Sequence, residues 1–139
     1  QIPEETQTQS NEVTQANLDD AVAFMKELAS KNNCVVAATG KYDLVADSST
    51  CYVIKNGIAK MEKITGTGCQ LSGIITSFIS ANPDCVLQAT AAAICLMGFA
   101  GEIAFDKNDG NATYRNKIID AIYNMSPSDL AKGAKYEIR

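Results

Sequence analysis

The sequence contains no histidine, and this absence excludes more chemistry than any other feature of its composition. Without an imidazole the chain cannot form a Ser-His-Asp triad or a Cys-His nucleophile pair, and it lacks the commonest protein ligand of zinc. Basic residues are also few, since 12 Lys and Arg stand against 16 Asp and Glu, and they do not cluster. With a net charge of −4, the chain is not expected to bind nucleic acid.

Paired cysteines are lacking as well. The five cysteines are an odd number, and no two of them form a C-x-x-C pair, so neither a disulfide framework nor a zinc knuckle is indicated. Reduced thiols are expected. A cysteine phosphatase loop is excluded at Cys69, because the position where its arginine would stand is Ile75.

Two targeting features are also absent from the sequence. The start "QIPEETQTQS" has acids and amides where a secretory leader carries positive charge and then an apolar stretch, so we expect a cytoplasmic protein. The longest apolar run, residues 89–101, is too short to span a bilayer and rich in small residues. It is therefore expected to be a buried helix, and no membrane partner is expected.

The length of 139 residues and the hydrophobic share of 46% fit one globular domain. Residues 1–16 are polar and aperiodic, and we interpret them as a tail or linker, with the folded domain at residues 17–139. A helix capped by Asn17 is predicted to run to Ala29, because its apolar residues recur at helical spacing. The apolar run of residues 34–39 then predicts a strand buried on both faces of a helix-covered sheet, which favours an α/β fold.

The remaining elements follow from turn and cap signals. Residues 43–47 and 50–57 are shorter expected strands, and Asn56-Gly57 predicts a hairpin turn into an antiparallel segment "IAKM". Helices are expected at residues 67–80, 83–105 and 111–125, followed by one short helix. In the second of these, Gly98 and Gly101 suggest a close helix contact. The short helix has Ser126 as its cap, Pro127 as its first residue and Asp129 as its third.

One short stretch, "ITGTGCQLS" at residues 64–72, combines a glycine-rich turn with the start of a helix. No Gly-Lys-Ser/Thr follows, which excludes a P-loop, and the third glycine of a dinucleotide fingerprint would fall at Leu71. What remains is a helix start whose backbone N–H groups and dipole form an anion hole, suited to a phosphoryl group in transfer. Such a position favours the thiolate of Cys69, which could accept a proton. The alternative is a tight turn with Cys69 as a small buried hydrophobic residue.

Three stretches give the chain a family resemblance: "CVVAATGKYDLVAD", "YVIKNGIAKMEKITGTGCQLSGIITSF" and "GNATYRNKIIDAIYNMSPSDL". On these, residues 28–139 resemble the later half of hydroxyethylthiazole kinase, of the ribokinase-like superfamily. The resemblance implies an α/β three-layer sandwich, a central mostly parallel sheet with helices on both faces, of which this chain holds only the C-terminal half. "TGTGC" is specific, because related sugar and pyrimidine kinases have an aspartate at the position of Cys69.

The resemblance implies transfer of the γ-phosphate of ATP, with Mg²⁺, to the primary hydroxyl of 4-methyl-5-(2-hydroxyethyl)thiazole in thiamine salvage. Cys69 would take the hydroxyl proton, Gly66 would lie against the substrate alcohol, and Gly68 would lie against the transferring phosphate. Thr39 matches a family threonine that contacts ATP phosphate, although a threonine at a strand end can instead bond its own turn.

Asp43 and Asp47 match family positions too, but are expected to be solvated turn carboxylates. The family's first half is missing here, and with it half the sheet, most of the thiazole pocket and the acids around Mg²⁺, so no metal ligand is expected in this chain and a separate chain could carry that half. Residues 1–16 match the family poorly.

The resemblance also implies a homotrimer with active sites between subunits. Two other functions stay open from the sequence. One is a kinase for another small alcohol, such as a hydroxymethylpyrimidine or a sugar. The other is a non-catalytic nucleotide-binding or assembly module, which the missing half favours.

Overall fold

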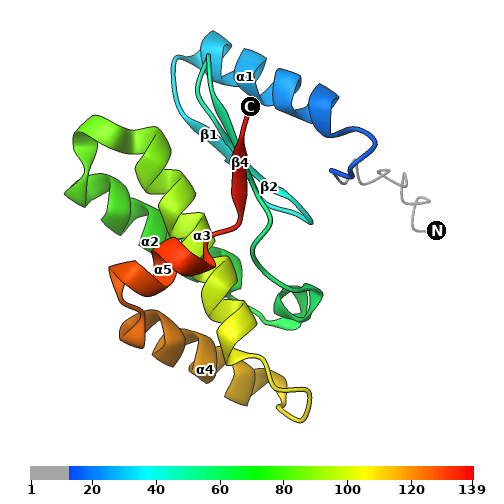
Figure 1. The fold of residues 1–139 in the computed structure, drawn as a ribbon, viewed down its shortest axis with the longest axis vertical. Coiled ribbons are helices and arrows are strands. Elements are labelled where there is room, and N and C mark those ends of the chain that lie inside the picture. The colour runs from blue at the N-terminus through cyan, green and yellow to red at the C-terminus, as the bar shows by residue number, and fades with distance from the viewer. Residues whose placement is uncertain (1–12) are drawn as a thin grey trace, which may run out of the picture.

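The computed structural model describes residues 13–139, so the expected tail at residues 1–12 lies outside the described residues. The elements are drawn in Figure 1 and their bounds are as follows: α1 Leu18–Asn32, β1 Val36–Ala38, β2 Asp43–Ala46, β3 Cys51–Ile54, η1 (3-10) Ala59–Lys63, α2 Thr67–Ala81, η2 (3-10) Pro83–Cys85, α3 Val86–Ala104, α4 Asn111–Asn124, α5 Pro127–Gly133 and β4 Tyr136–Ile138.

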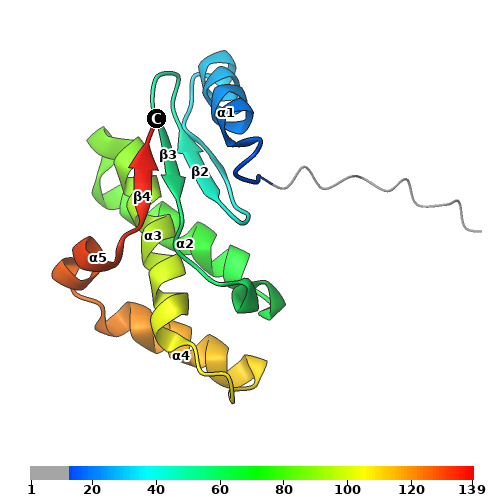
Figure 2. The same cartoon turned by 45° about the vertical axis from the view of Figure 1, so that its right-hand side comes forward.

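A four-stranded sheet with the order β1-β2-β3-β4 separates two helical layers. Strand residues alternate between them: Leu44 and Val53 pack with α1, whereas Val45 and Ile54 pack with α3. Figure 2 shows α1 on one side of the strands and α3 on the other. The expected α/β layering with helices on both faces is thus confirmed for this half of the fold. Each neighbouring pair of described strands is antiparallel, so the parallel part of the expected sheet is not among them.

The strand predicted at residues 34–39 is shorter and less buried than expected. β1 lies at an edge of the described sheet, pairing only with β2, and Ala37 and Ala38 are exposed. The prediction of burial on both faces is wrong for this chain. The apolar composition matched a central strand, but burial also needs a neighbour on each side, which composition cannot supply.

The start of α1 is at the predicted residue but has a different cap. Asn17 stands at the N-cap position, yet its side chain makes no cap hydrogen bond. Its Oδ1 instead accepts hydrogen bonds from the backbone N–H and the hydroxyl of Thr14, at 2.6 and 3.1 Å. Val13 packs against the core between α1 and the sheet. Residues 13–16 are therefore a structured turn and not a tail.

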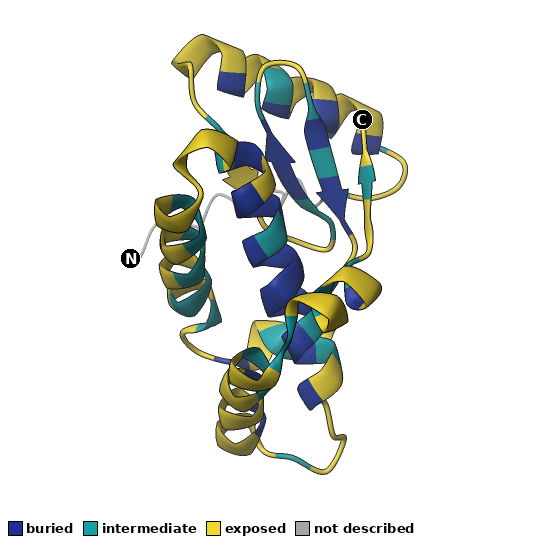
Figure 3. Cartoon of the chain, turned by 60° about the vertical axis from the view of Figure 1, so that its left-hand side comes forward, coloured by how far each residue is buried: buried dark blue, intermediate teal, exposed yellow. Residues whose placement is uncertain are grey.

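α3 is the central helix of the domain, and most of its residues are buried (Figure 3). With η2 it forms a helix from Pro83 to Ala104 that is long and apolar enough to cross a membrane by length and composition. The helix is thus longer than the apolar run of residues 89–101 on which the expectation was based. Of its most apolar stretch, however, 67% is buried inside the protein, packed against the sheet, α2 and α4. Its predicted role as a buried helix is confirmed.

The two glycines of α3 have a different partner from the one expected. The nearest atoms to a Cβ built on Gly98 belong to Asn56, and those nearest to a Cβ on Gly101 belong to Met61 in η1. The close contact is thus made with the segment after β3 and not with another long helix. That segment does not form the predicted hairpin, because the chain after Gly57 enters η1 and not a strand.

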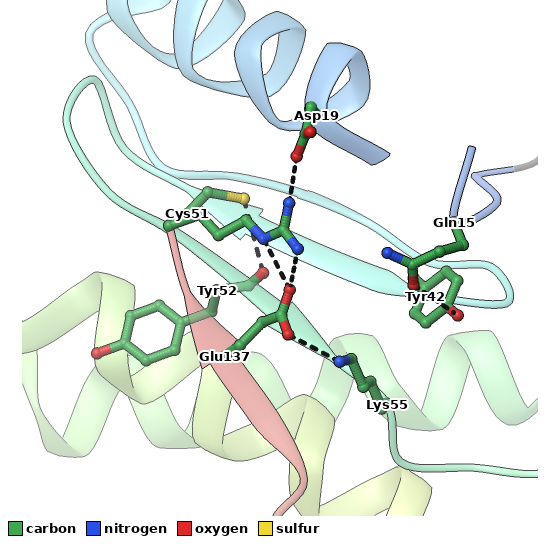
Figure 4. A network of polar contacts seen from close by, with 8 residues as sticks. Gln15, Asp19, Tyr42, Cys51, Tyr52, Lys55 and Glu137 are labelled. Atoms are coloured by element: carbon green, nitrogen blue, oxygen red, sulfur yellow. Dashed lines mark hydrogen bonds and ion pairs between the residues drawn. The ribbon is translucent and has the colours of Figure 1, made fainter. Parts of the chain in front are cut away.

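The C-terminal part returns to the sheet. α5 begins with the predicted capping box, in which the Ser126 hydroxyl accepts from the Asp129 backbone N–H and the Asp129 carboxylate accepts from the Ser126 backbone N–H. β4 then pairs with β3. Its Glu137 accepts hydrogen bonds from Lys55 at 2.8 Å and from Arg139, whose guanidinium also meets Asp19 of α1 (Figure 4).

Candidate active site

A pocket with a volume of about 950 Å³ opens where three chain segments meet above α3. One segment is the connection from β1 to β2, the second follows β3, and the third is the start of α2. The polar and glycine residues of its lining include Thr39, Gly40, Lys41, Asp43, Asn56, Gly57, Glu62, Thr67, Gly68 and Gly98. Residues far apart in the sequence thus form one cavity, since its lining runs from Val13, before α1, to Gly98 in α3.

The start of α2 leaves its first backbone donors without partners. Gly66 is the N-cap residue with a φ of 94°, and as glycine it has no side chain to cap the helix. The first hydrogen bond of the helix runs from the Gln70 N–H to the Gly66 carbonyl at 3.0 Å. The N–H groups of Thr67, Gly68 and Cys69 donate to no acceptor in the described chain. Free N–H groups at the positive end of a helix dipole are an anion-binding arrangement.

Thr39 and Gly68, the two predicted phosphate contacts, line the same pocket. Thr39 lies just after β1 with its side chain exposed, and its hydroxyl makes no hydrogen bond within residues 13–139. The alternative of a threonine that bonds its own turn is therefore not what the structure contains. The free hydroxyl and the free helix start therefore belong to one pocket wall, and each offers hydrogen-bond donors to an anion.

Gly66 and Cys69 flank Gly68 in the chain but do not belong to the pocket lining. Cys69 is the third residue of α2, and its side chain is exposed. The alternative of a small buried hydrophobic residue is thus wrong. The structure brings Thr39 and Gly68 together and leaves Gly66 and Cys69 beside them, at the same helix start.

The two aspartates of the sheet have different environments. Asp43 lines the pocket and is half-buried, and burial raises the pKa of its carboxyl to about 6, although the hydrogen bond from the Gly40 N–H acts in the opposite direction. The expectation of a solvated carboxylate at Asp43 is wrong. At Asp47 it fits: hydrogen bonds from the backbone N–H groups of Ser49 and Thr50 lower the pKa of its carboxyl.

A polar cluster behind the pocket was not foreseen from the sequence. The amide nitrogen of the buried Asn56 donates to the Gly133 carbonyl at 3.0 Å and to Glu102 at 3.1 Å, and its oxygen accepts from the Lys135 N–H at 2.7 Å. Glu102 also accepts from the Gly57 N–H at 2.9 Å. Burial alone would raise the pKa of Glu102, but its hydrogen bonds, with Lys135 first, lower it. The cluster fixes Asn56 and Gly57 in the pocket wall.

Residues 13–139 contain no group of three or more Cys, Asp and Glu side chains that could hold a metal ion. Asp43 and Glu62 are the carboxylates of the pocket lining. Magnesium in kinase sites is commonly held by one or two carboxylates together with substrate phosphates, so these two side chains alone do not define a metal site, and no chemical step is assigned to a metal held by this chain.

The chain is similar to proteins of known family. Over 131 residues it is 44% identical to the hydroxyethylthiazole kinase of Clostridium acetobutylicum, covering 92% of this chain and 48% of that protein. It is 39% identical over 120 residues to hydroxyethylthiazole kinase 2 of Clostridium botulinum strain Langeland, covering 86% of this chain and 44% of that protein. The chain therefore spans about half the length of the curated relatives it matches.

The fold has a solved counterpart in a hydroxyethylthiazole kinase protein from Pyrococcus horikoshii OT3. The TM-score is 0.81 at 25% sequence identity, over 89% of this chain and 48% of that one. The model of the hydroxyethylthiazole kinase family matches residues 4–128, which includes most of the segment that the sequence alone left unassigned. The chain belongs to the hydroxyethylthiazole kinase family.

Proposed function

We propose that the enzyme containing this chain phosphorylates the primary hydroxyl of 4-methyl-5-(2-hydroxyethyl)thiazole with ATP, a reaction of thiamine salvage. The observation that carries the proposal is the pocket that joins the uncapped start of α2 to the free hydroxyl of Thr39. Phosphoryl transfer needs a protein mainly to position the phosphate and to stabilise its charge. A helix start with open N–H groups suits both tasks.

The residue roles are part of this proposal. Gly68 and Thr39 hold the transferring phosphate from opposite sides, and Gly66 lies against the substrate alcohol. Cys69 removes the proton of that alcohol as the alcohol oxygen attacks the γ-phosphorus and ADP leaves. Cys69 is exposed at the helix start, so a ligand placed over Gly68 reaches it without displacing core side chains. Small residues at positions 66 and 68 leave the backbone open to the ligand, because a Cβ at either would meet no atom within 4 Å.

Magnesium enters the proposal as a complex with ATP, and therefore as part of the substrate. Its protein ligands and most of the thiazole pocket belong to the part of the family's length that this chain does not span. We further propose a cytoplasmic homotrimer with active sites between subunits. The unpaired state of all five cysteines supports a reducing compartment.

The function is tested with the intact enzyme, by following ADP release with the thiazole alcohol, hydroxymethylpyrimidine or ribose as acceptor. Turnover of the thiazole alone or with a clear kcat/KM advantage supports the proposal. Turnover of ribose or hydroxymethylpyrimidine without the thiazole overturns it in favour of another small-alcohol kinase. ATP binding without turnover of any acceptor identifies a nucleotide-binding module.

A further inference from the structure

The loop that carries Thr39 is closed by one side chain. β1 ends at Ala38 and β2 begins at Asp43, and between them Oδ1 of Asp43 accepts a hydrogen bond from the Gly40 N–H at 2.9 Å. Within residues 39–43 of the described chain no backbone-to-backbone hydrogen bond outside the sheet pairing spans this connection. The position of Thr39 relative to the sheet therefore depends on the carboxylate of Asp43.

Asp43 itself is firmly placed. Its Cα is paired with that of Ile54 on β3, a fully buried residue, and the strand that follows it is buried at Leu44, Val45 and Ala46. The Asp43 side chain begins on β2, which is paired with β3, and its carboxylate reaches back to the loop before β2. It therefore fixes the position of that loop relative to the sheet. The loop then has little freedom of its own.

Burial of a carboxylate in the wall of an anion pocket has a cost, since a charge removed from water is destabilised and a bound phosphate repels it. The raised pKa of Asp43, about 6, reflects the first of these effects. A serine or asparagine at the same position could close the turn without burying a charge. The carboxylate of Asp43 makes a stronger hydrogen bond to the Gly40 N–H than a neutral acceptor does.

We propose that Asp43 is a positioning residue of the phosphate site, which holds Thr39 against the bound nucleotide phosphate through its hydrogen bond to the Gly40 N–H. This inference rests on the proposed function, because it assigns Thr39 to nucleotide phosphate. Asp43 does not touch the reacting atoms. Its effect is on how well the loop is prepared for the ligand, and so on nucleotide affinity.

The test is ADP binding to the intact enzyme, measured by isothermal titration calorimetry on Asp43→Ala, Asp43→Asn and the control Asp47→Ala. Asp47 is a matched control because it is also an aspartate that closes a turn, at the other end of β2 and outside this pocket. Loss of a hydrogen bond to a charged group is expected to weaken ADP binding about 10-fold in Asp43→Ala. Asp43→Asn keeps an acceptor oxygen and should stay within about threefold of the wild type, and Asp47→Ala should bind normally.

A proton measurement separates positioning from loss of stability. Bound phosphate favours the protonated carboxyl, so near pH 6 the wild type should take up more protons on binding ADP than Asp43→Asn does. The other ionisable groups around Asp43 are the Cys95 thiol of α3, which interacts with it electrostatically, and Lys41, Tyr42 and Glu62 of the pocket lining. All four are present in both proteins, so the difference in proton uptake is assigned to Asp43. This readout needs only Asp43→Asn if Asp43→Ala does not fold.

The inference is overturned if Asp43→Ala binds ADP like the wild type, if Asp47→Ala weakens binding as much as Asp43→Ala, or if proton uptake is equal in wild type and Asp43→Asn. These outcomes are distinct from failure of the proposed function. An enzyme that binds ADP but does not phosphorylate the thiazole refutes the function and leaves the role of Asp43 measurable.

Discussion

Gly98 of α3 lies directly against the backbone of Asn56. A Cβ atom built on Gly98 would stand 2.7 Å from the Asn56 Cβ and 2.8 Å from its carbonyl carbon, closer than real Cβ contacts come. Asn56 cannot move aside easily, because its side chain is bonded to Glu102, Gly133 and the Lys135 N–H. The helix and the pocket wall are therefore in contact only because residue 98 is glycine.

Gly98→Ala should destabilise the protein by about 1–3 kcal/mol, as overpacking of a rigid contact does. Gly101→Ala is the matched control, because the atoms it would meet are the flexible end of Met61, which can rotate away. Urea unfolding of both variants measures the difference. Equal losses, or a larger loss at Gly101, would show that the Asn56 segment yields more readily than its hydrogen bonds suggest.

The two glycines before Cys69 should separate in their effects. Positive φ lies at Gly66 and not at Gly68, which has a helical backbone. Gly66→Ala should lose about 1 kcal/mol of stability, because an L-residue is strained at that φ. Gly68→Ala should fold at least as well as the wild type, since alanine is the better helix former, while its methyl group blocks approach of a phosphate.

Thermal unfolding and ADP binding, measured on both glycine variants, check this pair. A Gly68→Ala variant that binds ADP normally would remove Gly68 from the phosphate site.

Local signals in the sequence were reliable where a few neighbouring residues decide the structure. The start of α2 at Thr67 and the capping box of Ser126 and Asp129 are examples. The hairpin predicted at Asn56-Gly57 does not form, although the dipeptide is a strong hairpin signal. The Asn56 side chain instead bonds to partners at positions 133 and 135. No local pattern contains that information.

The candidate site was predictable to a similar extent. Thr39 and Gly68 were identified from the family resemblance, and the structure places both in one pocket. The burial of Asp43 was missed, because a turn aspartate looks the same in sequence whether α3 covers it or water does. A residue's environment depends on elements that lie far away in the chain, and only tertiary structure reveals it.

Cys69 can be tested as a proton acceptor by comparing two substitutions. Cys69→Ala should lower kcat by about 10²- to 10⁴-fold with little change in ATP affinity, the usual range for loss of general-base help. Cys69→Asp should retain activity, because a carboxylate is ionised at pH 7. Steady-state kinetics on the intact enzyme provides both values. An inert Cys69→Ala together with an inactive Cys69→Asp would mean that the thiol is not the base.

The 139-residue chain by itself should be catalytically silent. The described residues offer no group of three metal-ligating side chains, and the chain spans 48% of the relative from C. acetobutylicum. Phosphorylation of the thiazole by purified residues 1–139, verified by mass spectrometry, is the measurement. Substantial turnover would show that the missing half is dispensable for catalysis.

Asp43 should give the protein a specific pH dependence of stability. Its pKa is about 6 when folded and 3.8 ordinarily, so the folded state holds the proton more tightly. The stabilising contribution is complete below pH 3.8 and is lost as the pH rises through 6, by about 3 kcal/mol in total. Between pH 4 and pH 7, the free energy of unfolding of the wild type should therefore fall relative to that of Asp43→Asn. A constant difference would indicate that Asp43 is solvated.

The bonds of Asn56 also bear on when the pocket can form during synthesis. Its partners Gly133 and Lys135 lie 77 and 79 positions further along the chain. Polypeptides emerge from the ribosome N-terminus first, so the first three strands and the start of α2 are made long before the groups that fix Asn56. Until residue 135 has been translated, a buried amide next to the pocket lacks two of its hydrogen bonds. In the nascent chain the pocket wall at Asn56 therefore lacks these bonds, and the site is completed late in biosynthesis.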